Sequence, residues 1–131
     1  MTDSIATRIT NLATVAIPVA DQQRSLSFYI ETLGFELRLD APFGAGNRWI
    51  EVAPPGAVTT IALAPAAIPD WEKSGAMTGI RLQSDDAEAD HARLLGCGVD
   101  VDPDIMRWPG VPPMFTLRDP DGNGLVLIGK L

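Results

Sequence analysis

The chain is poor in the residues that most catalytic and metal sites use. Its 131 residues include one histidine, one cysteine (Cys97) and 6% aromatic residues. A single cysteine cannot form a disulfide within the chain, which predicts a reducing, cytoplasmic location. Acidic residues outnumber basic ones, and the net charge is −7. This charge argues against nucleic acid as a partner, because the protein has no net positive field to hold the phosphates. No apolar run reaches the roughly 18 residues of a membrane helix, and the N-terminus lacks the basic and apolar segments of a secretory signal.

The chain does contain a closing hairpin, Phe115 to Ile128. Two apolar runs flank Asp-Pro-Asp-Gly-Asn, in which Pro120 presets a turn and Gly122 tolerates a positive φ. Apolar runs on both sides of such a turn predict two antiparallel strands at the edge of a core. The hydrophobic fraction of 46% is enough for a substantial core.

The order strand, helix, strand, strand, strand is predicted twice. In the first half, Asp21 is a helix N-cap, and Pro18 marks its strand as an edge strand or as one with a bulge. In the second half, Asp85 and Glu88 form a capping box. The predicted strands are 12–19, 35–40, 48–53, 59–65, 78–83, 99–102 and the two strands of the hairpin. The predicted helices are 22–33 and 86–95. Residues 103–113 are predicted to form a loop.

This repeat predicts one α+β domain over 1–131, made of two βαβββ modules. Module 1 covers about 9–65 and module 2 about 77–131. The segment between them, about 66–76, is predicted to be a linker that could include a helical turn. Two such modules are expected to form curved mixed sheets around one cleft.

Two segments resemble the vicinal oxygen chelate superfamily, which includes glyoxalase I, extradiol dioxygenases and bleomycin-resistance proteins. They are "VADQQRSLSFYIETLGF" at 19–35 and "LRDPDGNGLVLI" at 117–128, and the resemblance extends from about residue 9 to 128. It implies paired βαβββ modules with the helices on the outer faces, and a homodimer. In family enzymes, His and Glu or Gln ligands hold a metal at four positions, two on the first strands and two on the last strands of the modules.

Carried onto this chain, those four positions are Thr14, Ala62, Gly79 and Val126. None of them supplies an imidazole or a carboxylate, and the single histidine, His91, falls on the second predicted helix. A site with two histidines and one carboxylate cannot be built from one histidine per chain. The sequence therefore predicts no metal and no cofactor.

Strand parity predicts what the cleft contains instead. If the aliphatic residues pack under the helices, the alternate residues face the cleft, and they are apolar or aromatic with a few polar groups, as in many small-molecule pockets. Together with Trp108 from the 103–113 loop, the predicted ligand-binding residues are Thr14, Trp49, Glu51, Thr60, Arg81, Gln83 and Met114.

Each of these residues also has a structural interpretation. Trp49 could be a core or interface aromatic, and Glu51 could simply pair with Arg81. Trp108 could be a lid or a dimer contact. His91 is interpreted as a solvated helix residue and Cys97 as a small buried residue.

The leading hypothesis is a metal-free protein of the bleomycin-resistance type that binds an apolar or aromatic ligand, with or without an acidic group. The competing hypothesis is an enzyme related to glyoxalases or dioxygenases, a lyase or isomerase with Glu51 as general base. A third is a regulatory module with a collapsed pocket.

Overall fold

The computed structural model describes residues 7–44, 46–65 and 75–131. The predicted linker therefore lies largely outside the described residues. None of the helices in the described ranges has the length and apolar composition to cross a bilayer. The elements of the first half are β1 (Thr14–Val19), α1 (Gln22–Ser27), the π-helical turn η1 (Phe28–Thr32), β2 (Glu36–Phe43), β3 (Asn47–Ala53) and β4 (Thr60–Pro65). Those of the second half are β5 (Met77–Gln83), α2 (Ala87–Gly96), β6 (Asp100–Val101), β7 (Met106–Trp108), β8 (Val111–Arg118) and β9 (Gly124–Ile128).

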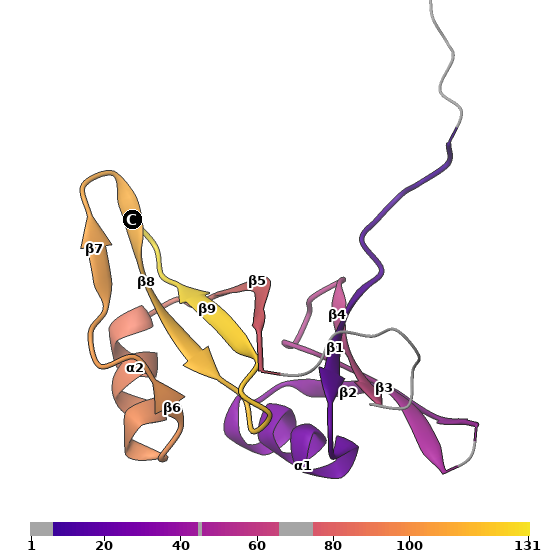
Figure 1. Cartoon of the computed structure of the whole chain (residues 1–131). Coiled ribbons are helices and arrows are strands. Elements are labelled where there is room, and N and C mark those ends of the chain that lie inside the picture. Colours follow the sequence, from indigo (N-terminus) through magenta and orange to yellow (C-terminus); the bar gives the residue numbers. More distant parts are fainter. Residues whose placement is uncertain (1–6, 45, 66–74) are drawn as a thin grey trace, which may run out of the picture.

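The two halves form two mixed sheets with the same plan. The first sheet has the order β1-β4-β3-β2, and the second has β5-β9-β8-β6 with β7 also paired to β8. In each half the first and last strands are parallel neighbours, β1 with β4 and β5 with β9. Figure 1 shows the two sheets diverging like the sides of a V, with α1 near the base and α2 beside β8. The predicted α+β fold with a repeated βαβββ order is confirmed.

The N-cap of the first helix is the predicted residue, whereas the N-cap of the second helix lies one residue after the predicted one. Asp21 accepts a hydrogen bond from the Arg24 amide, as an N-cap does. In α2 the N-cap is Asp86, whose side chain accepts from the Ala89 amide, so the predicted Asp85–Glu88 capping box is wrong. The Asp85 carboxylate instead pairs with Lys130 at 2.8 Å.

The predicted 103–113 loop is also wrong in part, because it contains β7 and the start of β8. Proline suggested a loop since it donates no backbone hydrogen bond. Here the Pro113 carbonyl accepts a hydrogen bond from the Gly129 amide at 2.8 Å, and this role needs no backbone donor. Met106 pairs with Met114 and Trp108 pairs with Val111, and the register shifts between these pairs, where β8 contains its two prolines. The result is a hairpin that extends from the second sheet (Figure 1).

One hydrophobic core lies against the helix-covered faces of both sheets. Its members alternate along the strands as predicted, and the largest are fully buried. They include Ile17, Tyr29, Ile50, Val52, Leu63, Phe115, Leu117 and Leu125. The residues between them therefore lie on the opposite face of each sheet, which we call the open face.

The β8–β9 turn connects the two halves. Asp119 holds the turn together by accepting hydrogen bonds from the amides of Asp121 and Asn123, each at 2.9 Å. Its other oxygen accepts from the buried Tyr29 hydroxyl at 2.9 Å. Burial, followed by the nearby charge of Asp119, raises the pKa of Tyr29 far above its usual value.

Further contacts from the same turn reach β1 and α1. Asp121 accepts from the Ala20 amide at 2.9 Å and from the Ser25 hydroxyl at 3.2 Å. The buried Asn123 side chain donates to the Pro18 carbonyl at 2.9 Å. These contacts explain the position of Pro18: it lies on an edge strand, as predicted, and its carbonyl is used by the other half.

Candidate functional site

The open face of the first sheet carries a chain of hydrogen bonds centred on Glu51. The Trp49 indole donates to Glu51 Oε2 at 2.8 Å, and the Thr60 hydroxyl donates to Oε1 at 2.8 Å. The Thr14 hydroxyl lies 2.8 Å from that of Thr60. Adjacent strands β1, β4 and β3 position these groups, since Thr14 pairs with Thr60 and Glu51 pairs with Ala62. Four of the predicted site residues are therefore brought together.

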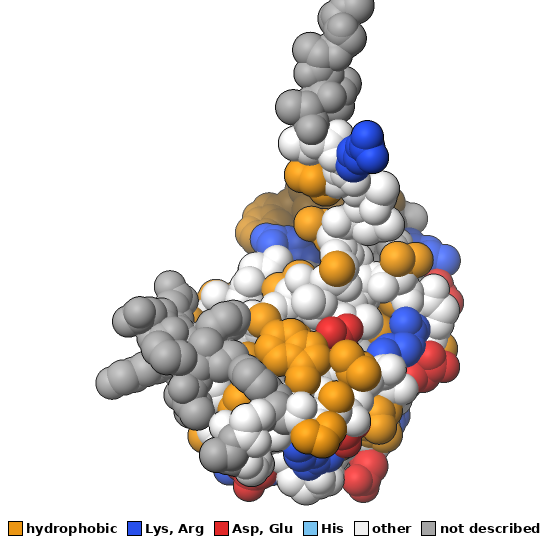
Figure 2. All heavy atoms as spheres, turned by 90° about the vertical axis from the view of Figure 1, so that its right-hand side faces the viewer, with side chains coloured by type: hydrophobic (Ala, Val, Ile, Leu, Met, Phe, Trp, Pro, Cys, Tyr) orange, Lys and Arg blue, Asp and Glu red, His pale blue; other side chains and the backbone are white. Residues whose placement is uncertain are grey.

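This arrangement fixes a carboxylate in a semi-exposed setting. Trp49 and Glu51 are half-buried, whereas Thr60 is buried. Both carboxylate oxygens are oriented by donors, so Glu51 presents its charge in a defined direction. Figure 2, which faces the side of the first sheet, shows hydrophobic side chains gathered at the centre with charged groups among and around them. Such a surface can bind an apolar or aromatic body and one polar group.

Leu39 belongs to this open face and was not predicted. Strict alternation along the strand would put Leu37 and Leu39 on the same face. The register of β2 shifts between Leu37 and Leu39, so that Leu37 pairs with Val52 of the core face and Leu39 pairs with Glu51. The exposed Arg38 side chain, which bonds the Pro54 and Ala57 carbonyls of the β3–β4 turn, lies at this irregularity. Period-two reasoning cannot detect a bulge of this kind.

The second sheet presents the other predicted residues. Arg81 pairs with Val126, which pairs with Thr116 across β9 and β8. The Arg81 side chain is exposed and its Nη1 lies 3.4 Å from the Gly79 carbonyl. Met114 pairs with Met106 of β7, so the two residues lie opposite each other on the two strands of the hairpin.

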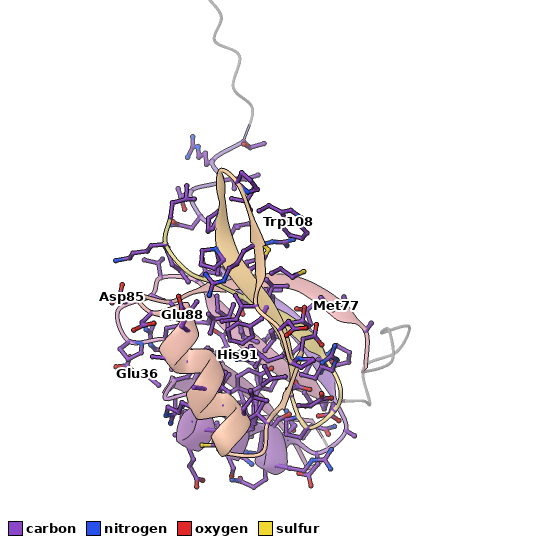
Figure 3. All side chains as sticks on the ribbon, turned by 90° about the vertical axis from the view of Figure 1, so that its left-hand side faces the viewer. Glu36, Met77, Asp85, Glu88, His91 and Trp108 are labelled. Carbon is purple, nitrogen blue, oxygen red and sulfur yellow. The ribbon has the colours of Figure 1, made fainter. Side chains whose placement is uncertain are left out.

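Trp108 is an exposed residue of β7, with 56% of its surface accessible. Figure 3 shows it on the hairpin, on the same side of the molecule as Met77 and away from Glu88 of α2. The single chain gives Trp108 no enclosed pocket among the described residues. The choice between a lid and a dimer contact therefore stays open.

Gln83 lies at the end of β5 and borders a different feature. A crevice of about 170 Å³ opens on the helix-covered side, between the β3–β4 turn and α2. Leucine and proline side chains line most of it, including Leu33, Pro54, Pro55, Leu82, Leu94 and Leu127. This crevice was not predicted, because it arises from the packing of one half against the other.

Glu51 and Arg81 do not pair with each other within the described chain. Glu51 is bonded to Trp49 and Thr60, and Arg81 contacts its own strand. The alternative that the two residues form an ion pair across one chain is therefore wrong. Their location around a single cavity remains a prediction.

The four carried-over metal positions do not fit a metal ion. The Thr14 hydroxyl donates a hydrogen bond to the Thr60 carbonyl. Ala62 is fully buried, and its side chain is a methyl group. Gly79 has no side chain and Val126 is a buried aliphatic residue. No group of three or more His, Cys, Asp or Glu side chains that could hold a metal occurs in the described part of the chain.

His91 and Cys97 both differ from their predicted environments. His91 is buried, its ring packs edge-on against Phe115 with centroids 4.8 Å apart, and Nε2 lies 2.8 Å from the Asp102 carbonyl. It is a core residue of α2 and not a solvated one. Cys97 is exposed, because it follows the last residue of α2 where the chain turns at the surface.

Comparison with known proteins places these features among relatives. A profile described as "Glyoxalase/Bleomycin resistance protein/Dioxygenase superfamily" matches residues 11–127. The crystal structure of TnmS3, an antibiotic binding protein from Streptomyces sp. CB03234, is 36% identical with a TM-score of 0.84, over 96% of this chain and 100% of that one. A superfamily member from Sphaerobacter thermophilus is 33% identical with a TM-score of 0.87, over 95% and 100%. "Uncharacterized protein YetH" of Bacillus subtilis (strain 168) is 32% identical over 91% of this chain and 98% of its own length.

Proposed function

Since the chain belongs to the glyoxalase/bleomycin resistance protein/dioxygenase superfamily, we propose that it is a metal-free protein that binds and sequesters an apolar or aromatic small molecule. The observation that carries the proposal is the open face of the first sheet, where Trp49 lies beside an oriented Glu51 on a surface of small and apolar residues. The similarity to TnmS3, described as an antibiotic binding protein, supports an antibiotic-like ligand.

We further propose that the protein is a cytoplasmic homodimer and has neither nucleic acid nor membrane as a partner. In one chain Met77, Trp108 and Leu39 keep 59%, 56% and 44% of their surface exposed. Exposed apolar groups of this kind favour association. A second copy that covers part of them would also enclose the open faces. Light scattering is expected to give about twice the 14.0 kDa of one chain.

A thermal-shift titration tests the binding function. A ligand that binds only the folded state at 100 times its Kd adds about 2.7 kcal/mol of stability, which raises Tm by several degrees. The panel is metal-free bleomycin, an anthraquinone and a non-aromatic sugar of similar size. We expect an aromatic member to raise Tm, and Trp49→Ala to reduce that shift while Trp49→Phe retains most of it. Equal shifts in the wild type and Trp49→Ala would contradict a site on the first sheet.

Arg81 provides a separate test of the second sheet. An exposed guanidinium can pair with a carboxylate in two parallel hydrogen bonds. Arg81→Ala is therefore expected to weaken the binding of 2-naphthoate several-fold more than the binding of its neutral methyl ester. Arg8→Ala removes the same charge from another exposed position and should leave this ratio unchanged. If Arg81→Ala weakens both compounds equally, Arg81 does not recognise an anion.

The second candidate is a lyase or isomerase in which Glu51 is the general base. The orientation of Glu51 by two donors favours this role, because a base must be held within reach of its proton. Turnover of an aromatic ligand that Glu51→Gln abolishes while binding persists would support the enzyme over the sequestering protein.

A further inference from the structure

Glu51 has no basic partner among the side chains that the structure describes. Among the residues that the structure describes, its hydrogen-bond donors are the Trp49 indole and the Thr60 hydroxyl, both neutral, and it takes part in no ion pair. A half-buried carboxylate loses part of its hydration, and neutral donors compensate for only part of that loss. A cationic group that approaches Glu51 would therefore find a strong, incompletely satisfied acceptor.

The Glu51 carboxylate keeps acceptor positions that no donor among the described residues uses. Each carboxylate oxygen has two acceptor positions; the Trp49 indole occupies one position on Oε2 and the Thr60 hydroxyl one position on Oε1. The cross-strand neighbours of Glu51 are Ala62 on one side and Leu39 on the other. Neither of these neighbours can pair with a charge. The Thr14 hydroxyl donates to the Thr60 carbonyl at 3.2 Å and lies 2.8 Å from the Thr60 hydroxyl, so it helps to hold the second donor in place.

Trp49 adds an aromatic group next to the carboxylate. An indole face attracts a cation in addition to its contact with apolar groups. The net charge of −7 also favours the approach of cations over anions at low ionic strength. The exposed Arg81, in contrast, has no neighbouring aromatic group or oriented partner among the contacts described for the second sheet.

We propose that Glu51 and Trp49 form a subsite for a protonated amine attached to an aromatic or apolar body. This inference rests on the proposed binding function and names the ligand class that the first sheet selects. The ammonium donates to the free acceptor positions of Glu51, and the adjoining apolar part contacts Trp49. Because the subsite lies on the first sheet, it operates separately from any anion contact at Arg81.

Calorimetry with three matched probes tests the subsite: 2-naphthylmethylammonium, 2-naphthylmethanol and 2-naphthoate, each titrated into the full-length protein at pH 7 and low salt. A hydrogen bond to a charged group is stronger than one between neutral groups, and the difference in strength corresponds to about tenfold in affinity. We expect the ammonium to bind the wild type about tenfold more tightly than the alcohol, and this ratio to fall as salt is added. Glu51→Gln should bring the ratio close to one.

Two variants serve as controls. Glu31→Gln changes the net charge equally at an exposed position of η1 and should keep the tenfold ratio. Glu51→Asp keeps the charge and should retain a preference for the ammonium, which shows that loss of the preference in Glu51→Gln does not come from misfolding.

Each outcome separates the inference from the proposed function. If the alcohol binds but the ammonium gains no advantage in the wild type, the subsite is refuted while aromatic binding stands. A ratio in Glu51→Gln that equals the wild-type ratio also refutes the role of Glu51. If none of the three probes binds, both the subsite and the binding function on this face are refuted.

Discussion

At the scale of single residues, Tyr29 is the most constrained titratable group. It is the only tyrosine, its side chain is fully buried, and its hydroxyl donates to Asp119 at 2.9 Å. Its position could be predicted from helical spacing, but its partner could not, because Asp119 follows 90 residues later. The residue pair is formed only by the tertiary fold.

This environment predicts how stability responds to alkaline pH. Because burial raises the pKa of Tyr29 above its ordinary 10, the unfolded chain releases the proton above pH 10 while the folded chain retains it. The Tyr29 contribution to stability is thus present below pH 10 and lost as pH rises further. Absorbance of the native protein should show no tyrosinate until the protein unfolds. Tyr29→Phe should reduce the loss of stability above pH 10; tyrosinate in the folded protein at pH 10.5 would contradict the buried hydrogen bond.

The open-face residues show how far parity reasoning extends. Trp49, Glu51 and Thr60 could be located because β3 and β4 alternate regularly. Leu39 could not, since the bulge in β2 reverses the parity. His91 was misjudged because its burial depends on Phe115 of the distant hairpin.

At the scale of elements, the β8–β9 turn depends on Gly122, whose φ is +82°. A residue with a Cβ costs about 1–2 kcal/mol in this left-handed conformation. Gly122→Ala is therefore expected to lower the free energy of unfolding by about 1–2 kcal/mol in urea denaturation. The added Cβ would also lie 3.4 Å from the Gly75 Cα.

Gly96 offers a matched control for this prediction. It is the last residue of α2, has no positive φ, and an added Cβ there meets nothing within 4 Å. Gly96→Ala should be neutral or stabilising, because alanine has the higher helix propensity. Equal destabilisation by the two substitutions would mean that the turn does not require its glycine.

The strands and helices were predictable to the extent that their signals were local. Asp21 and the apolar spacing after it determined α1, and the Asp-Pro-Asp-Gly-Asn motif determined the closing hairpin. The 103–113 segment was misjudged because β7 and β8 are stabilised by pairing across a register shift, which local composition does not report. Propensity gives way to tertiary pairing at such positions.

At the scale of the whole molecule, the protein is expected to contain no stoichiometric Zn, Fe, Ni or Mn. Thr14, Ala62, Gly79 and Val126 provide no imidazole or carboxylate at the positions that hold metal in family enzymes. Elemental analysis should find well under one metal ion per chain, and a chelator should leave Tm unchanged. One ion per chain that survives dialysis would contradict this prediction.

The two-module plan was predictable because the repeat is visible in the sequence, and the parallel pairs β1–β4 and β5–β9 confirm its order. The module limits, about 9–65 and 77–131, remain a proposal. Which faces meet in a dimer could not be predicted, since that depends on surfaces that one chain leaves exposed.

The hydrogen bonds between the β8–β9 turn and the first half affect how the chain folds during its synthesis. Asp121 and Asn123 bond the first half across 101 and 105 residues of sequence. Contacts between such distant residues form late and slow the folding of a chain. On a translating ribosome, β1 and α1 emerge long before Asp119 has been added, so the Tyr29 hydroxyl and the Ala20 amide cannot reach their final partners during most of synthesis. The first half can pair its own strands during this time, but it lacks the contacts with the turn until Asp119 to Asn123 have left the ribosome.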